Sequence, residues 1–362
     1  MIKGWDIIAV AGEWRWDEME IEHHLSLRLA RHNRVLFIEL KPSGRRGIVE
    51  IRSNLYLFSP IPRARKLVPL RNALMRSRVA SSLHKLGFSS PLLFIFDPAG
   101  GGLIGVCGEV LSVYFKPRLP MSGREEGIAS QVSLCIAPSQ RDYERMMELN
   151  LNAFYVPPGI DLEHFSKALL PGTAVPPELE WIPRPRIGVR AVSGDLLDLD
   201  LLEGLIDRHP EWSFVLLGEP GRRALRLALY PNVYRLGAKP YEELPGYLKG
   251  LDVAISPYIL SDLTLGLHPV EVKEHLAAGL PVVATDLPEL RKLADVVHLA
   301  EDIDGFEAGI RLALAERGRI DLMLRRREKV MGESWEERVE LLSEIISRYI
   351  AARIGRLTGG NG

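Results

Sequence analysis

The sequence has little cysteine, almost no net charge and no long hydrophobic run. Only two cysteines, Cys107 and Cys135, occur among 362 residues, and both stand in apolar contexts. This excludes a disulfide scaffold and fits core packing in a reducing compartment. The formal net charge of −1 gives no general attraction to nucleic acid. Because no apolar stretch reaches the roughly 18 residues of a membrane span and no basic-then-apolar leader opens the chain, we expect a cytoplasmic protein.

Acidic residues are missing between Glu50 and Asp97. Within this gap, residues 63–85 carry several arginines and lysines, and apolar residues recur among them near helical spacing. Such a stretch is either a solvated helix whose apolar stripe packs on its own domain, or a basic surface for anionic lipid headgroups or a lipid-linked diphosphate. The second alternative gives the hypothesis of a peripheral contact with the inner membrane surface.

What the sequence does contain is a regular alternation of short apolar runs and longer amphipathic stretches. This alternation is typical of α/β domains with parallel sheets and crossover helices, and the length favours about two domains. The candidate strands form two sets: residues 6–11, 34–39, 92–96, 111–115 and 132–139, then residues 187–189, 213–218, 233–237, 253–258, 281–286 and 296–300.

A proline-dense segment separates the two sets of strands. Residues 169–185 contain five prolines and are predicted to be a linker. We therefore assign residues 1–168 to a first domain and residues 186–334 to a second, and we expect the amphipathic helix 335–354 to cross back to the first. Ligands of open α/β sheets bind beyond the carboxyl ends of the strands. A cleft between two such edges is the expected site.

The segment HPVEVKEHLAAGLPVVATDLPEL, residues 268–290, predicts a helix followed by a buried strand. Pro269 suits a first helical position, because no N–H is needed there. Gly279 supplies a left-handed cap conformation, and Pro281 blocks further helix. The all-apolar run after Pro281 is typical of a parallel strand buried on both faces.

This segment resembles the donor-site helix of GT-B glycosyltransferases, particularly family 4, and most of all the teichuronic-acid-biosynthesis type of bacterial enzyme. Four further segments resemble other parts of the same family in the same order. They are residues 6–39 for the opening of the acceptor domain, 136–165 for the passage into the linker, and 197–221 and 231–258 for the nucleotide domain.

The resemblance implies a GT-B fold, in which two Rossmann-like doubly wound α/β domains face a central cleft. It implies transfer of a sugar from a nucleotide diphosphate sugar to a glycan or lipid-linked acceptor in cell-envelope polysaccharide synthesis, mostly with retention of configuration. It implies no cofactor besides the nucleotide-sugar co-substrate, and no metal. Asp198 and Asp200 do form an Asp-x-Asp pattern, but they stand where a helix is expected to start.

The resemblance assigns donor contacts around residues 264–274. The backbone of Thr264, Leu265 and Gly266 would offer donors to the diphosphate at the helix start. Glu274 aligns with the family glutamate that accepts hydrogen bonds from ribose hydroxyls, although a helix acid paired with a nearby base is the alternative. His268, at the helix entrance, is a candidate catalytic and donor-binding group, or else a cap or packed ring.

Three more residues are candidates for donor binding. Arg190 ends the first strand of the second domain and would neutralise a diphosphate with forked donors, or else pair with Asp195 or Asp198. The backbone at Gly237 and Ala238 would read the base edge, although a simple strand-to-helix turn explains the glycine equally well.

Acceptor contacts are expected after two strands of the first domain. Asp97 ends a strand and is aimed at the cleft by position, with three glycines that keep the next loop open, so it is the second candidate catalytic residue. The other candidates follow the first strand. They are Gly12, Glu13, Trp14, Arg15 and Trp16. Gly12 would let the acceptor approach the backbone, and Arg15 would contact a phosphate. Trp14 and Trp16 would stack on a sugar or, as the alternative, pack at the domain interface.

One donor-site position departs from the family. Glu271 stands where relatives carry a lysine, three residues before the ribose glutamate, and a carboxylate facing a diphosphate repels it. Lys273 lies about 200° away round the helix and cannot replace the lost charge. Two hypotheses follow: an active glycosyltransferase with an altered donor pocket that includes Glu271, or a non-catalytic GT-B module that binds a partner enzyme or a glycan.

Overall fold

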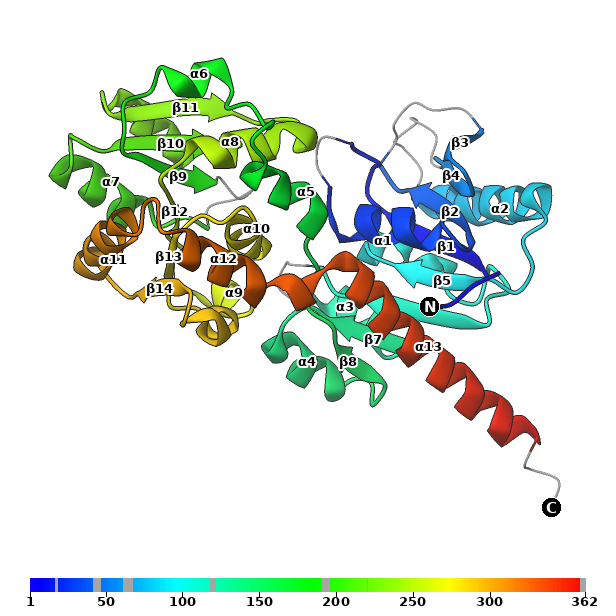
Figure 1. The fold of residues 1–362 in the computed structure, drawn as a ribbon. Coiled ribbons are helices and arrows are strands. Elements are labelled where there is room, and N and C mark those ends of the chain that lie inside the picture. Colours follow the sequence, from blue (N-terminus) through cyan, green and yellow to red (C-terminus); the bar gives the residue numbers. More distant parts are fainter. Residues whose placement is uncertain are drawn as a thin grey trace. The chain divides into compact units, whose positions relative to one another are not determined.

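The computed structural model describes residues 1–16, 19–41, 47–60, 68–117, 122–190, 196–219 and 221–358, with the backbone alone for 68–72 and 356–358. The chain forms two compact units. The first comprises the chain up to Pro158, apart from a short stretch at Trp16, together with the final helix α13 (Trp335–Thr358). The second runs from Gly159 to Ser334. The first unit thus contains both ends of the sequence, coloured blue and red in Figure 1.

In the described residues, the first unit is built on an eight-stranded sheet with the order β3-β4-β2-β1-β5-β6-β7-β8. Its strands are parallel except for the antiparallel edge pair β3–β4. The bounds are β1 (Asp6–Ala11), β2 (Arg34–Glu39), β3 (Ile48–Arg52), β4 (Leu55–Phe58), β5 (Leu92–Ile95), β6 (Leu111–Phe115), β7 (Leu134–Ala137) and β8 (Ala153–Tyr155). The sequence pattern missed β3, β4 and β8, which are short strands at or near the sheet edges.

Helices cover both faces of this sheet, because each central strand is apolar on both sides. Ile7 packs with Leu25 and Val339 in one core, whereas its neighbour Ile8 packs with Val79 in the other. Helices α1 and α13 therefore lie on one face and α2, α3 and α4 on the opposite face. Their bounds are α1 (Ile21–Leu29), α2 (Val68–Leu86), α3 (Gly123–Ala129) and α4 (Gln140–Met147).

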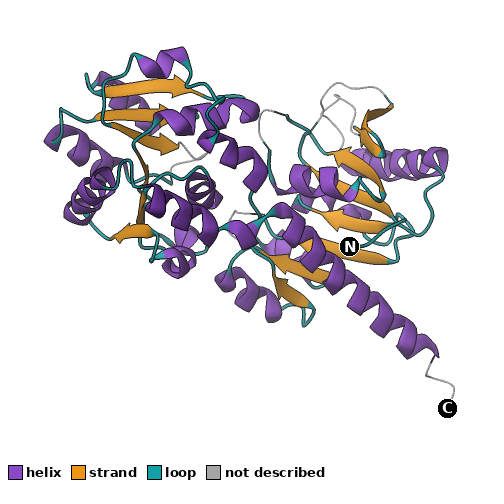
Figure 2. Cartoon of the chain, in the orientation of Figure 1, coloured by secondary structure: helices purple, strands orange, loops and turns teal. Residues whose placement is uncertain are grey.

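Over its described residues, the second unit is built on a six-stranded parallel sheet with the order β11-β10-β9-β12-β13-β14. Figure 2 shows the strands of each unit accompanied by helices. The strands are β9 (Arg186–Arg190), β10 (Ser213–Leu217), β11 (Val233–Gly237), β12 (Val253–Ser256), β13 (Val282–Thr285) and β14 (Val297–Ala300). The helices are α5 (Leu162–Ser166), α6 (Pro177–Glu180), α7 (Leu199–Arg208), α8 (Leu244–Gly250), α9 (Asp262–Leu265), α10 (Val270–Ala277), α11 (Ile303–Ala315) and α12 (Ile320–Lys329). The prediction of two doubly wound α/β domains is confirmed.

The two units divide after Pro158, whereas the sequence predicts the change near residue 168. Helix α5 explains the difference, because it packs on the second unit. Phe165 is fully buried, and the ring of His164 stacks on Tyr241 with 4.3 Å between centroids. Residues 169–185, expected to be a linker, also belong to the second unit and contain α6. Their carbonyls at Leu170 and Thr173 accept hydrogen bonds from the Lys249 ammonium at 2.6 and 2.8 Å.

Helix α10 ends as its sequence predicts. Gly279 has φ of +80°, a left-handed conformation that glycine adopts without strain. A Cβ atom at this position would also lie 2.6 Å from Cγ of Met323, so the site excludes side chains by contact as well. The chain then enters β13, whose four residues are all buried. The end of α10 therefore lies near the start of β13, and the start of α10 lies toward the carboxyl edge of the sheet.

Candidate functional site

The centre of the candidate site is an ion pair between Arg190 and Glu274. Arg190 is the last residue of β9, and its guanidinium donates to the Glu274 carboxylate on α10. The Arg190 side chain is 29% exposed and that of Glu274 only 9%. Burial alone would lower the pKa of Arg190, but the carboxylates of Glu274 and Glu271 outweigh it and raise that pKa. The guanidinium is therefore held charged between two acids at the carboxyl edge of the sheet.

The second acid, Glu271, is held by a tyrosine that the sequence analysis missed. The Tyr258 hydroxyl donates to the Glu271 carboxylate, and both residues are buried. The Tyr258 N–H donates to Oγ1 of Thr285 at 2.8 Å, and that hydroxyl donates back to the Tyr258 carbonyl at 3.1 Å. The ends of β12 and β13 thus fix Tyr258, and Tyr258 fixes Glu271. Its place just after a buried strand puts it at the ligand-binding edge of the sheet, but many residues share such a position.

The charge of the family lysine is not restored from Lys273. This ammonium is buried and lies 2.6 Å from a carboxylate oxygen of Glu333, near the end of the second unit. Glu271 and Lys273 therefore contact different partners, as expected for residues two positions apart on a helix.

His268 lies buried immediately before α10 and contacts a third acid, Glu289. Its Nδ1 atom is 3.2 Å from Oε2 of Glu289, which also receives the Lys292 ammonium at 3.2 Å. Burial, followed by the charge of Lys273, lowers the pKa of His268 to about 3. The imidazole is therefore neutral near pH 7. The sequence named His268 but not Glu289, which stands on the 3₁₀ helix η5 (Pro288–Leu293).

His275, which lies on α10, is a second buried neutral imidazole near the site. Its side chain is 2% exposed, and its Nδ1 atom has no hydrogen-bond partner among the described residues. Burial, together with the nearby charge of Arg190, lowers its pKa to about 3. His268 and His275 thus add no positive charge to the site.

The expected backbone donors at Thr264, Leu265 and Gly266 are already used. They belong to the short helix α9 and its cap rather than to an open loop. The N–H of Thr264 donates to the Ser261 hydroxyl at 3.3 Å, and the N–H of Leu265 to the Ser261 carbonyl at 2.9 Å. The N–H of Gly266 donates within the same turn at 3.2 Å. These three N–H groups therefore have partners within the chain, and their contact with a diphosphate stays a prediction. The first turn of α10 is another helix start at this sheet edge that could face an anion.

Gly237 and Ala238 form a turn at the end of β11. Gly237 has φ of +73°, and the N–H of Ala238 lies 3.5 Å from a carboxylate oxygen of Glu219. The turn that explained the glycine equally well in the sequence is therefore present. Contact of this backbone with a nucleobase stays a prediction.

Comparison with known proteins matches the part of the chain that carries α10 and its neighbours, but not Arg190. Residues 198–316 match the family of glycosyl transferases group 1. This part of the chain is similar to that family. Over 101 residues the chain is also 32% identical to the putative teichuronic acid biosynthesis glycosyltransferase TuaH of Bacillus subtilis (strain 168). That match spans 27% of this chain and 25% of the relative, so the chain aligns with about a quarter of that protein.

Solved structures extend the comparison to both units as a likeness of fold. Sucrose-phosphate synthase from Thermosynechococcus elongatus superposes with a TM-score of 0.73 at 15% identity, covering 96% of this chain and all of the other. The catalytic domain of starch synthase IV from Arabidopsis thaliana, bound to ADP and acarbose, gives 0.71 at 12% identity, covering 97% and 100%. Anabaena HepE in complex with UDP and glucose gives 0.66 at 14%, covering 94% and 99%. The architecture that surrounds the group 1 segment is GT-B.

Outside the group 1 segment, the expected acceptor loop is partly a core element. Trp14 is 3% exposed, and its ring meets Phe37 edge-on at 5.0 Å and His23 at 4.9 Å. The backbone N–H of Trp14 donates to the Glu39 carboxylate at 3.1 Å. Trp14 therefore packs inside the first unit and does not stack on a sugar, which corrects the prediction.

The other residues of this loop have less buried positions. Trp16 is 38% exposed and Arg15 is exposed, whereas Gly12 and Glu13 are half-buried. The Glu13 carbonyl lies 3.2 Å from Nε2 of His23. Their acceptor contacts stay predictions.

Asp97 serves as a helix cap. Its carboxylate accepts a hydrogen bond of 2.8 Å from the Ala99 N–H at the start of the 3₁₀ helix η1 (Pro98–Leu103). The glycines that follow do not keep the loop open, because Cβ atoms at Gly100 and Gly101 would lie 2.6 Å from Val10 and 2.8 Å from Ile128. They permit close packing instead, and Asp97 as an acceptor contact stays a prediction.

The two aspartates of the Asp-x-Asp pattern have different structural roles. Asp198 caps α7 by accepting from the Leu201 N–H at 2.9 Å, and Asp200 pairs with Arg226 at 2.8 Å. Arg190 pairs with Glu274 and not with Asp198, and Asp195 lies outside the described residues. No group of three or more acids, histidines or cysteines placed to hold a metal occurs in the part of the chain that the structure describes.

The basic stretch 63–85 is described from residue 68 onward, as helix α2. Val79 and Leu83 are buried in the core of the first unit, so this part of the apolar stripe packs on its own domain. Arg76 and Arg78 are exposed yet donate to the carbonyls of Gly102 and Pro60 at 3.0 and 3.1 Å. Contact with lipid stays a prediction. Among the described helices, none combines the length and apolarity needed to cross a membrane.

Proposed function

We propose that this chain is a glycosyltransferase that takes a sugar from a nucleotide diphosphate sugar. The observation that carries the proposal is the Arg190–Glu274 pair near the start of α10, where Glu274 lies inside the segment that matches the group 1 family and Arg190 lies shortly before it. One side chain of this pair suits a diphosphate and the other suits ribose hydroxyls.

The geometry supports a division of work along α10. The Arg190 guanidinium neutralises the charge that develops on the diphosphate as the glycosidic bond breaks. The first N–H groups of α10 face the same anion, because a helix start leaves them without intrahelical partners. Glu274, one turn further on, accepts hydrogen bonds from the ribose. Donor binding therefore separates Arg190 from Glu274, and each group takes a ligand partner in exchange.

The acceptor is a glycan or lipid-linked molecule of cell-envelope polysaccharide synthesis, and the transfer retains configuration. The similarity to the teichuronic-acid-type relative supports this acceptor class. Asp97, Gly12, Glu13, Arg15 and Trp16 are the acceptor-side candidates that remain. The enzyme works in the cytoplasm, with the basic stretch 63–85 turned to the inner membrane face, and it needs no metal.

Glu271 supports a second candidate function, that of a non-catalytic module that binds a partner enzyme or a glycan. Two carboxylates beside one guanidinium leave this group of three with an excess negative charge, and a diphosphate approaching it is repelled. A chain that no longer binds a nucleotide has no need to avoid that repulsion.

Calorimetric titration with UDP, GDP and ADP decides between the two candidates. The wild-type chain is expected to bind at least one of them, and Glu271→Lys to bind it about tenfold or more tightly, because a like charge is replaced by an opposite one in a buried site. Glu271→Gln, which fits the same space, should give a smaller gain in the same direction.

Asp304→Lys is the matched control, because it makes the same charge change at a side chain that is 80% exposed on α11. It should leave the nucleotide affinity unchanged. If neither the wild type nor the Glu271 variants bind any of the three nucleotides, the transferase proposal is rejected and the non-catalytic module is favoured.

A further inference from the structure

His268 and Glu289 form a buried polar pair, whereas a ring that only fills space in the core needs no polar partner. Both side chains are almost fully buried, with 2% and 6% exposure, and they approach each other through one ring nitrogen, Nδ1. Glu289 is itself held by the Lys292 ammonium at 3.2 Å. The ring stands two residues before the first residue of α10, at the same sheet edge as Arg190.

The chemistry of this contact fixes the tautomer of the imidazole. A carboxylate without a proton only accepts hydrogen bonds, so Nδ1 of His268 must carry the hydrogen that lies between them. A neutral imidazole has one N–H, which leaves Nε2 with a lone pair. His268 therefore presents an acceptor, and a phosphate oxygen, which is also an acceptor, is not its partner.

The order of groups along α10 indicates which part of a donor lies at His268. In the proposed function, the ribose meets Glu274 in the second turn and the diphosphate meets the first turn. The sugar that is bonded to the far phosphate then lies before the helix begins, where His268 stands. Sugar hydroxyls are the hydrogen-bond donors of such a ligand.

We propose that Glu289 is a positioning residue that holds His268 as the Nδ1–H tautomer, so that Nε2 accepts a hydrogen bond from a hydroxyl group of the transferred sugar. This inference rests on the proposed function and deepens it. It assigns His268 to recognition of the donor sugar rather than to proton donation, since a neutral ring with Nε2 unprotonated has no proton to give there.

Nitrogen-15 NMR of the ligand-free full-length chain tests the tautomer directly. In the wild type, Nε2 of His268 should show the shift of an unprotonated ring nitrogen. In Glu289→Gln, the side-chain amide can donate to Nδ1, and the signal should move toward the Nε2–H form. A wild-type spectrum with Nε2 protonated would overturn the inference.

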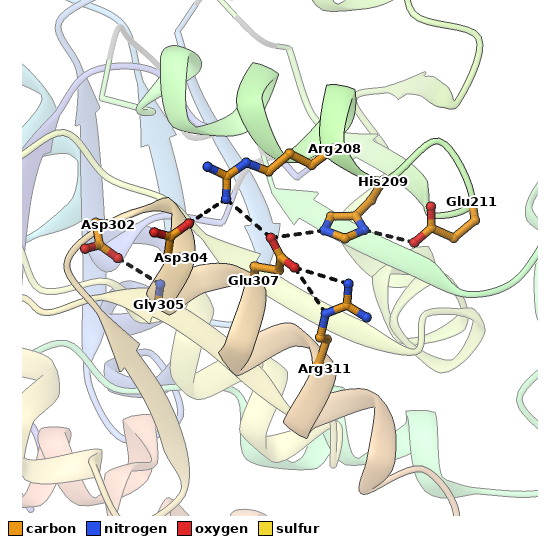
Figure 3. Close-up of polar contacts among 8 residues, drawn as sticks. All are labelled: Arg208, His209, Glu211, Asp302, Asp304, Gly305, Glu307 and Arg311. Atoms are coloured by element: carbon orange, nitrogen blue, oxygen red, sulfur yellow. Dashed lines mark hydrogen bonds and ion pairs between the residues drawn. The ribbon is translucent and has the colours of Figure 1, made fainter.

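A second histidine–carboxylate pair in the same unit gives the matched control. Figure 3 shows His209 between two acids, with Nδ1 at 2.9 Å from Glu211 and Nε2 at 3.4 Å from Glu307. It precedes β10 and so lies at the amino edge of the sheet, away from α10. Glu211→Gln should change the His209 signal and leave the His268 signal and all ligand affinities unchanged.

Paired titrations with UDP and UDP-glucose, and with GDP and GDP-mannose, test the ligand role. Glu289→Gln should weaken binding of the nucleotide sugar by about tenfold, the scale of one net hydrogen bond, and leave the nucleotide without a sugar unaffected. His268→Gln, which keeps an acceptor near the Nε2 position, should retain much of the affinity for the sugar, whereas His268→Leu should lose it. Thermal unfolding of each variant confirms that the chain is folded.

Two outcomes separate this inference from the function on which it rests. If the wild type binds none of these ligands, the proposed function fails and the role of His268 fails with it. If the wild type binds them and Glu289→Gln weakens the nucleotide as much as the nucleotide sugar, the proposed function stands and the inference alone is rejected.

Discussion

The carboxyl edges of the two sheets carry similar residue types but use them differently. In the first unit, Trp14 fills the core, Asp97 caps a 3₁₀ helix and Lys116 pairs with Asp142 at 3.2 Å. In the second unit, Arg190 and the acids of α10 pair with one another across strands and a helix.

The difference lies in whether a ligand can take over the contact. A cap or a core ring is satisfied by its own neighbours, and removing it only costs stability. An ion pair at a helix start offers both charges to a ligand that carries the complementary groups, so its loss changes binding as well as stability. The second edge is therefore the better candidate for chemistry, and the following variants test the contrast in order of expected effect.

Replacement of Trp14 should have the largest effect on stability. Trp14→Ala should lower the free energy of unfolding by about 3–5 kcal/mol, because it removes a large buried ring from the core of the first unit. Urea unfolding measures the change. Trp16→Ala, at a side chain that is 38% exposed, should change it by about 0.5 kcal/mol or less. Equal effects of the two variants would indicate that Trp14 is a surface residue. The contrast between the two sheet edges would then be lost.

Replacement of Arg190 should have a moderate effect on stability and a clear effect on binding. Arg190→Met leaves Glu274 and Glu271 without the guanidinium between them, which should cost about 1–3 kcal/mol. Arg190→Lys keeps the charge but not the fork, and should recover part of the stability. Urea unfolding and nucleotide titration measure both effects. An Arg190→Met chain with wild-type stability and wild-type nucleotide affinity would show that this pair has neither role.

His275 should change only the pH dependence of stability, and only below about pH 6.5. Its folded pKa of about 3 lies below the value of 6.5 for an exposed histidine, so between these values the unfolded chain binds a proton that the folded chain does not. Stability therefore falls as pH drops from about 6.5 toward 3.

His275→Leu should flatten this fall by about 1.4 kcal/mol per pH unit, measured by urea unfolding across the range. The same substitution at His32, which is exposed, should leave the slope unchanged. An unchanged slope in His275→Leu would mean that the imidazole is solvated and that α10 is open at this point.

Much of the fold could be predicted because it depends on local patterns. The apolar runs became the central strands, and Gly279 became the left-handed end of α10. The linker was misplaced, because proline density reports where regular structure stops and not where a domain ends. Residues 169–185 stop the strands but still pack on α8.

The site was predicted less completely, since its parts come together from distant positions. Arg190 and Glu274 were both named, but their contact joins residues 84 positions apart. Tyr258 and Glu289 were missed, because a tyrosine after a strand and a glutamate in a turn have no distinctive spacing.

The sequence by itself determined two α/β units, the bounds of most strands, and a polar helix that starts at a sheet edge and ends at a glycine. Local backbone preference and apolar periodicity are enough for these features. Only the tertiary structure decided that Trp14 is core, that the N–H groups of 264–266 are used, and that Arg190 lies between two acids. These outcomes depend on which groups meet after burial, and burial makes each polar group find a partner wherever in the chain that partner lies.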